Sequence, residues 1–149
     1  MALAEIQQQL AGVWVLQTNE NLDEYLKEIG VGFVFRKLAS AASSTMTITV
    51  EGENIRIITK GAKDTEAFFA LGEEFDNTDP QDNPVKAIAT WKDGCLFTDA
   101  RPVDPNRGKA QQVERRIVNG NLEISKTEII SIFLGWFSCL SDWEFSRRL

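Results

Sequence analysis

Few residues in this chain could take part in chemistry. The chain has no histidine, so the most common general base and the most common metal ligand are both absent. It contains no glycine-rich phosphate loop, no Ser/His/Asp set and no Cys/His cluster. Cys95 follows Gly94 in a predicted hairpin with no base nearby in the sequence, so we interpret it as a packed or surface thiol. The sequence therefore predicts a protein that is not an enzyme and has no catalytic residue, metal site or cofactor.

Two adjacent arginines, Arg115 and Arg116, lie in a predicted strand over residues 113–118. Successive side chains of a strand point to opposite faces, so one of the two is buried if one face lines an interior. A buried guanidinium needs an anion or a full set of acceptors, and its planar fork suits a carboxylate. The alternative that the sequence leaves open is a rim position where both arginines stay hydrated.

Composition and charge limit the class of protein that could hold such a site. The chain has 149 residues, of which 43% are hydrophobic and 26% charged, as expected for a single folded domain over residues 1–149. A net charge of -6 argues against a nucleic-acid partner, which would require a basic face. Cys95 and Cys139 are isolated in the sequence, so we expect reduced thiols. The N-terminal residues carry a glutamate and a glutamine run in place of an apolar signal segment, which predicts a cytoplasmic protein.

Helical periodicity is confined to one region, residues 20–42. One apolar stripe predicts a short helix, with Asn19 or Asn21 as its cap and Gly30 and Gly32 at its end; the stripe consists of Leu22, Tyr25, Leu26 and Ile29. A second stripe predicts another short helix and consists of Val34, Leu38 and Ala41. Both stripes fit either ordinary core packing or a lid over a cavity.

From residue 45 onward the hydrophobic period changes to two, which indicates strands. The predicted strands cover residues 45–51, 55–59, 65–71, 85–91, 96–98, 113–118 and 122–127. Asn119-Gly120 is the strongest hairpin signal, and residues 99–109 are predicted to form a longer exposed loop. Strands at this spacing form an up-and-down meander that must close or sandwich to protect its edges.

The opening Gly12-Val-Trp14, the helical segment Asn21-Leu-Asp-Glu-Tyr25 and the turn Gly30-Val-Gly32 together resemble the intracellular fatty-acid-binding protein family. These are small β-barrels that carry fatty acids, retinoids and bile acids in the cytosol. The resemblance covers about residues 10–127. It implies a mainly β fold, a ten-stranded antiparallel up-and-down β-barrel (β-clam) capped by a helix-turn-helix lid, with one or two hydrophobic ligands in an interior cavity.

The resemblance also implies a binding site for a fatty acid or a similar hydrophobic carboxylate. Arg115 matches the family's inward arginine, and Arg147 is the best match to the arginine of an Arg-x-Tyr pair in the last strand, with Leu149 in place of the tyrosine. Lys126 stands where the family usually has an apolar lining residue. The lining and portal residues implied are Leu22, Tyr25, Leu26, Val31, Phe35, Ala39, Ala62, Val113 and Ile124.

The resemblance decays over residues 128–149. An apolar run over residues 129–140 interrupts the expected final strand, either as an inserted hairpin or as a divergent C-terminus. It is too short to span a membrane.

We expect a monomer that contacts anionic membranes through a basic cluster near the lid, formed by Lys27, Arg36, Lys37, Lys60 and Lys63. The alternative is that these cations pair with nearby acids. Three other functions stay open: a lipocalin-like extracellular carrier, a lipid enzyme, and a degenerate non-binding paralogue that acts as an interaction protein.

Overall fold

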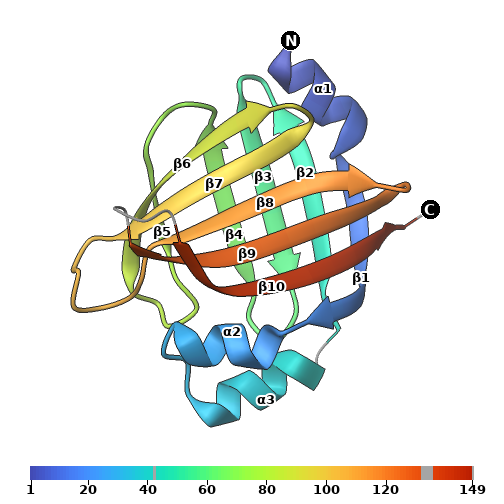
Figure 1. The fold of residues 1–149 in the computed structure, drawn as a ribbon. Coiled ribbons are helices and arrows are strands. Elements are labelled where there is room, and N and C mark those ends of the chain that lie inside the picture. The colour runs from blue at the N-terminus through green and yellow to red at the C-terminus, as the bar shows by residue number, and fades with distance from the viewer. Residues whose placement is uncertain (42, 132–135, 149) are drawn as a thin grey trace.

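The computed structural model describes residues 1–41, 43–131 and 136–148. Ten strands form one antiparallel sheet in the order β4-β3-β2-β1-β10-β9-β8-β7-β6-β5, which curls into a nearly closed barrel (Figure 1). The strands are β1 Gly12–Glu20, β2 Thr45–Glu51, β3 Asn54–Lys60, β4 Thr65–Ala70, β5 Phe75–Thr78, β6 Pro84–Lys92, β7 Cys95–Pro102, β8 Gln111–Val118, β9 Asn121–Ser131 and β10 Trp136–Arg147. The helices are α1 Ala2–Gln9, α2 Leu22–Glu28 and α3 Phe33–Ala41. The predicted fold class is confirmed.

The period-two pattern corresponds to side chains that point alternately to the inside and the outside of this barrel. In β6, for example, Val85, Ala87 and Ala89 are buried, whereas the residues between them are exposed. At the predicted hairpin of β8 and β9, Asn119 and Gly120 have φ angles of 53° and 82°. Two successive positive φ values match the twist of the flanking strands, which is why Asn-Gly is favoured in such turns.

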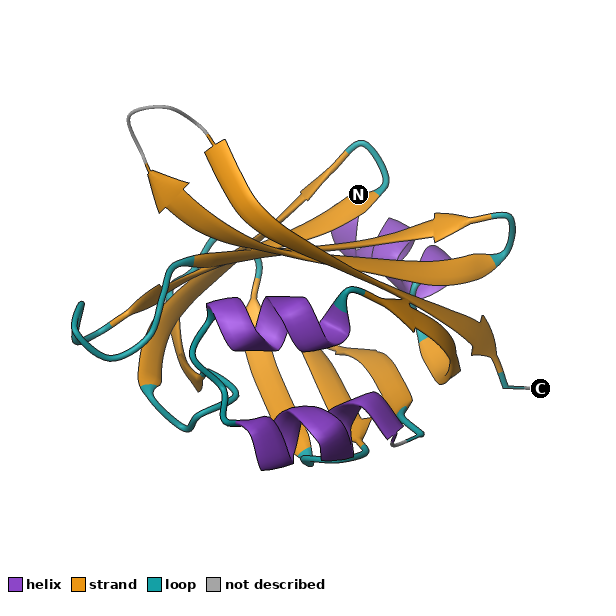
Figure 2. Cartoon of the chain, turned by 60° about the horizontal axis from the view of Figure 1, so that its bottom comes forward, coloured by secondary structure: helices purple, strands orange, loops and turns teal. Residues whose placement is uncertain are grey.

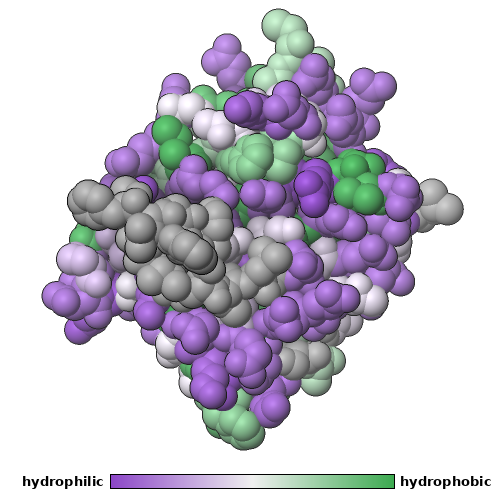
Figure 3. All heavy atoms as spheres, viewed as in Figure 1, coloured by the Kyte–Doolittle hydropathy of each residue, from purple (hydrophilic) through white to green (hydrophobic). Residues whose placement is uncertain are grey.

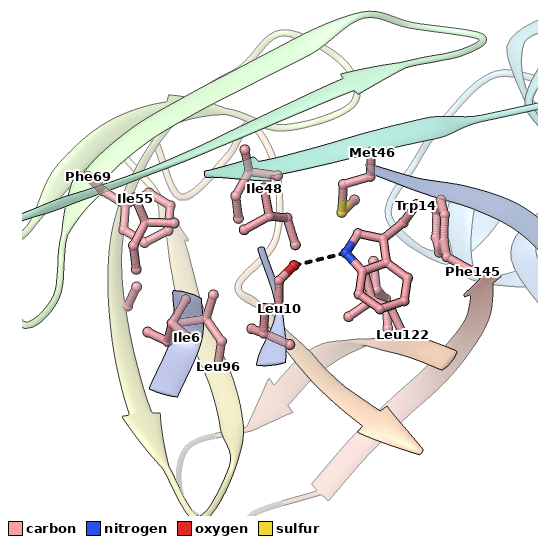
Figure 4. Packing of buried hydrophobic residues seen from close by; sticks show 13 residues of the cluster. Ile6, Leu10, Trp14, Met46, Ile48, Ile55, Phe69, Leu96, Leu122 and Phe145 are labelled. Atoms are coloured by element: carbon pink, nitrogen blue, oxygen red, sulfur yellow. Dashed lines mark hydrogen bonds between the residues drawn. The ribbon is translucent and has the colours of Figure 1, made fainter. Parts of the chain in front are cut away.

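Helix α1, which the sequence analysis did not predict, lies at the end of the barrel opposite α2 and α3 (Figure 1). Ile6 of α1 and Leu10, the residue that follows the helix, are fully buried in the main hydrophobic cluster. The indole Nε1 of Trp14 donates a hydrogen bond to the Leu10 carbonyl at 2.8 Å (Figure 4). Ile48 and Phe145 belong to the same cluster, so buried strand side chains pack with Ile6 and Leu10 at this end of the barrel.

Two strand predictions require correction. The predicted loop over residues 99–109 begins too early, because β7 continues to Pro102, which pairs with Val85. The short strand β5 was not predicted; it pairs with β6 from Phe75 to Thr78.

The apolar run over residues 129–140 extends both arms of the β9–β10 hairpin. Within the described residues, Trp136 pairs with Ser131 and Leu140 pairs with Thr127. Figure 2 shows the two arms reaching past the neighbouring strands. The inserted-hairpin interpretation thus fits the described strands, and the remainder of the run, residues 132–135, lies outside them. Strand β10 still reaches β1, where Arg147 pairs with Trp14.

Helices α2 and α3 cover one end of the barrel (Figure 2). The α2 stripe packs as predicted, in a second cluster of Leu22, Tyr25, Leu26, Ile29 and Val31. Asn21 is the N-cap residue, although its side chain makes no capping hydrogen bond.

The α3 stripe was assigned to the wrong face. Val34 and Leu38 are 73% and 60% exposed, whereas Phe35 and Ala39, one position further along, pack against the second cluster. Figure 3 shows hydrophobic atoms at the lower tip of the molecule, where α3 lies. The described part of the chain has no helix with the length and apolarity needed to cross a bilayer.

Candidate ligand-binding site

A cavity of about 270 Å³ lies inside the barrel, with walls from the main cluster, the lid helices and the inner faces of the strands. Most of the predicted lining residues do line it: Leu22, Tyr25, Leu26, Phe35, Ala39, Ala62, Val113, Arg115 and Ile124. Its walls are mainly apolar side chains. The lid therefore covers a cavity in addition to packing on a core.

Val31 and Arg147, two predicted site residues, do not line this cavity. Val31 is buried within the lid cluster instead. Arg147 lies at the end of β10, on the far side of the buried Phe145. Its guanidinium stacks 4.4 Å from the centre of the Trp14 ring and donates to the carbonyls of Ala11 and Gln9, at 2.8 and 3.2 Å.

Arg147 therefore fastens the end of α1 to β10. Its Nη1 lies 2.7 Å from where a Cβ on Gly12 would be. Gly12 has a φ of 139°, a backbone conformation that residues with a side chain rarely adopt, so glycine is favoured at this position. Arg147, predicted to contact the ligand carboxylate, is thus absent from the cavity lining, and its guanidinium donates to backbone carbonyls instead.

Arg115 faces the cavity, and Arg116 points outward towards Glu123, at an Nε–Oε2 distance of 4.0 Å. One of the two arginines is thus turned inward, as the strand pattern predicts. The Nε of Arg115 is buried and has no hydrogen-bond partner among the described residues. Burial lowers the pKa of Arg115 to about 10, because removing the guanidinium from water disfavours its charged form.

Lys126 is a second cation in the cavity, and the sequence analysis recorded it only as a departure from the family pattern. It follows Leu122 and Ile124 with a spacing of two, so strand alternation alone could have placed it on the inner face. Its Nζ lies 4.3 Å from the centre of the Trp143 ring. Burial, and then the nearby charge of Arg115, lower the pKa of Lys126 to about 8.

The strand register brings these cations together with a hydroxyl. Thr98 pairs with Val113, and Val113 pairs with Lys126, so all three lie in one row across β7, β8 and β9. Arg115 lies two residues further along β8. The Oγ1 of Thr98 is also buried and has no partner among the described residues. Three hydrogen-bond donors with unused capacity therefore line an otherwise mainly apolar wall, which suits an oxygen-bearing group at the end of an apolar ligand.

Polar contacts connect the lid to the loops at the mouth of the cavity. The loop between β5 and β6 reaches the lid through Gln81, whose side-chain amide donates to the Gly30 carbonyl. It reaches the β3–β4 turn through Lys63, whose Nζ contacts Asp82 at 2.6 Å. The Tyr25 hydroxyl donates to the side chain of Gln111 on β8. We call residues 79–83 the mouth loop.

Three of the five cations in the predicted basic cluster have acidic partners. Lys63 pairs with Asp82, Lys60 with Asp64 at 3.4 Å, and Arg36 with Asp23 at 3.2 Å. The alternative of local ion pairs therefore describes these three cations. Lys27 and Lys37 are exposed on the lid.

Comparisons with known proteins give one consistent result. The model of the lipocalin / cytosolic fatty-acid binding protein family matches residues 11–131. The adipocyte fatty acid-binding protein of Pygoscelis papua is 38% identical over 120 residues, covering 80% of this chain and 88% of that protein. Human fatty acid-binding protein 9 is 35% identical over 114 residues, covering 76% and 83%. The crystal structure of apo lipid binding protein 8 from Caenorhabditis elegans superposes with a TM-score of 0.85 at 25% identity, covering 95% and 96%.

Proposed function

Because the chain belongs to the lipocalin / cytosolic fatty-acid binding protein family, we propose that it carries a long-chain fatty acid or a similar hydrophobic carboxylate in this cavity. The observation that supports this most directly is the buried Nε of Arg115, which has no partner among the described residues. A buried cation in an apolar cavity is costly unless an anion joins it. A carboxylate would supply that anion, and its alkyl chain would be stabilised by about 0.8 kcal/mol per buried methylene.

In this proposal the carboxylate accepts hydrogen bonds from Arg115 and from the ammonium of Lys126, with the Thr98 hydroxyl as a third donor. Lys126 takes the role that the family resemblance implies for Arg147, because the Arg147 guanidinium already donates hydrogen bonds to the carbonyls at the end of α1. The acyl chain lies among the apolar residues beneath the lid, such as Leu22 and Phe35.

The test is to replace Arg115 with Gln and to titrate hexadecanoate and hexadecanol by calorimetry. A hydrogen bond to a charged group contributes about 1.5–3 kcal/mol, so hexadecanoate should lose roughly ten- to a hundredfold in affinity while hexadecanol changes little. Arg116→Gln is the matched control, because it removes the neighbouring arginine on the outer face. Equal losses for both ligands would remove Arg115 from the carboxylate site.

We further propose that the protein works in the cytosol as a monomer and delivers its ligand by contact with anionic membranes. Lys27 and Lys37 on the lid, together with the exposed apolar residues of α3, support this surface. Each lysine near an anionic bilayer contributes about 1 kcal/mol. Transfer to vesicles should accelerate with anionic lipid content, and K27E/K37E should remove that dependence without changing ligand affinity. A transfer rate indifferent to vesicle charge would indicate release through water.

We propose no catalysis. The thiol of Cys95 is buried, and burial, followed by the charge of Glu114, raises its pKa, so the nucleophilic thiolate is disfavoured. Incubation with acyl esters or acyl-CoA should give no turnover above a denatured control. A rate abolished by Cys95→Ser would overturn this part of the proposal.

A further inference from the structure

We propose that Lys126 is a covalent capture site for long-chain aldehydes, which bind in the cavity and form a reversible imine with its side-chain amine. This rests on the proposed function only in that the same cavity accommodates the alkyl chain. It adds a second class of ligand, an uncharged carbonyl compound, and gives Lys126 a role that an arginine at this position could not perform.

The surroundings of Lys126 favour an amine that can lose its charge. The residue lines the cavity, where burial disfavours the charged ammonium. The contact of its Nζ with the Trp143 ring, 4.3 Å from the ring centre, acts in the opposite direction, because the ring face attracts the ammonium. No carboxylate among the described residues forms an ion pair with it. The charged group nearby is Arg115, which repels a second positive charge in the same cavity. The lowered pKa of about 8 agrees with this geometry, since about a tenth of the amine is uncharged at pH 7 and about half at pH 8.

The chemistry needs only the amine and the aldehyde. The nitrogen lone pair of Lys126 forms a bond to the carbonyl carbon, and the carbon–oxygen π electrons move to the oxygen. One N–H proton passes to that oxygen, which gives a carbinolamine. The hydroxyl then leaves as water with the second N–H proton, and a carbon–nitrogen double bond forms. No oxidant, reductant or further reactant is required.

Two groups beside Lys126 can stabilise the oxygen during this step. Thr98 lies in the same cross-strand row, two positions from Lys126, and Arg115 lies on the adjacent row of β8. The Oγ1 of Thr98 and the Nε of Arg115 are both buried without partners among the described residues. A hydroxyl and a guanidinium N–H that are already desolvated can donate to the developing negative charge on oxygen.

The experiment uses the full chain with hexadecanal as the probe. The protein is incubated with hexadecanal, the imine is reduced with cyanoborohydride, and the adduct is located by mass spectrometry of the intact protein and of its peptides. We expect one alkyl group on Lys126, at about tenfold or more above any surface lysine, because the bound chain holds the aldehyde next to the amine. Hexadecanoate in excess should protect Lys126 and leave the surface lysines unaffected.

Two variants complete the design. Lys126→Arg keeps the positive charge but removes the reactive amine, so the single adduct should disappear, while circular dichroism checks that the barrel has folded. Lys92→Arg is the matched control, because Lys92 is exposed at the end of β6, and the adduct on Lys126 should persist.

Labelling spread evenly over the surface lysines would overturn the capture site. So would a Lys126 adduct that hexadecanoate does not reduce under conditions where hexadecanoate binds in the cavity. Binding of hexadecanoate without modification of Lys126 refutes this inference alone. If hexadecanoate does not bind, the proposed function fails, whereas selective labelling of Lys126 by hexadecanal would still support capture.

Discussion

Carboxylate binding beside Lys126 should depend on pH in a range where most fatty-acid sites built on arginine would not respond. The pKa of Lys126 in the free protein is about 8. A carboxylate is stabilised by the ammonium form, so above this pH binding must be accompanied by uptake of a proton. Near pH 9 only about a tenth of the free protein carries that proton, and the affinity for a carboxylate should be about tenfold lower than near pH 7, or about 1.4 kcal/mol.

Titration calorimetry with dodecanoate tests this directly. Repeating each titration in two buffers with different ionisation enthalpies counts the protons taken up. The count should approach one near pH 9 in the natural protein and stay near zero in Lys126→Arg, because arginine remains charged throughout. Dodecanol is the uncharged control and should show no loss of affinity with rising pH. A pH slope that is the same in Lys126→Arg, or an absence of proton uptake, would refute the role of Lys126 as a carboxylate contact.

Three further predictions concern the stability of the ligand-free protein and the rate at which a bound ligand leaves. In the unliganded protein Lys126→Met should raise the free energy of unfolding near neutral pH, by up to about 3 kcal/mol, because it removes a buried cation without an ion-pair partner among the described residues. Between the folded pKa of about 8 and the ordinary lysine pKa of 10.5, the unfolded chain binds more protons than the folded one. The free energy of unfolding of the natural protein should therefore rise with pH over this range, and its difference from the variant should shrink. Urea titrations at several pH values measure both. Leu10→Ala should cost about 2–5 kcal/mol in the same assay, since its side chain is fully buried at the α1 end of the barrel; a loss below about 1 kcal/mol would mean that α1 is dispensable. Lys63→Met should free the mouth loop and speed ligand release in stopped-flow experiments, with Asp82→Asn giving the same effect, and unchanged rates in both would show that the mouth loop does not limit exit.

The sequence contained enough local information to predict most strands and the direction of Arg115. The alternation over residues 113–118 and the Asn119-Gly120 turn depend only on neighbours along the chain, and the structure contains both. The face of α3 could not be chosen in this way, because apolar residues occupy adjacent positions such as Val34 and Phe35 and only contact with α2 decides between them.

Non-local geometry also decides where Arg147 and Lys126 lie relative to the cavity. Arg147 has the same strand parity as Phe145, but whether that face meets a cavity or the end of α1 depends on how far β10 runs past β1. The α1 segment carries an apolar stripe of Leu3, Ile6 and, just after the helix, Leu10, but a run of three glutamines separates the last two and makes the helical period hard to recognise. Alternation from Leu122 and Ile124 places Lys126 on the inner face of β9, at a position where the resemblance implies an apolar residue, but the sequence alone does not show that its neighbour in the cavity is Arg115.

The pairing of β1 with β10 has a consequence for biosynthesis. The first strand has β2 on one side and the last strand on the other, and Arg147 hydrogen-bonds to residues just before β1. Contacts between the two ends of a chain close a long loop and so form late in folding. During synthesis, β1 and β9 therefore each keep one edge unpaired until β10 has left the ribosome. A nascent sheet with open edges can bind chaperones and can aggregate. Truncation near the C-terminus should thus impair production of the folded barrel more than its small loss of mass suggests.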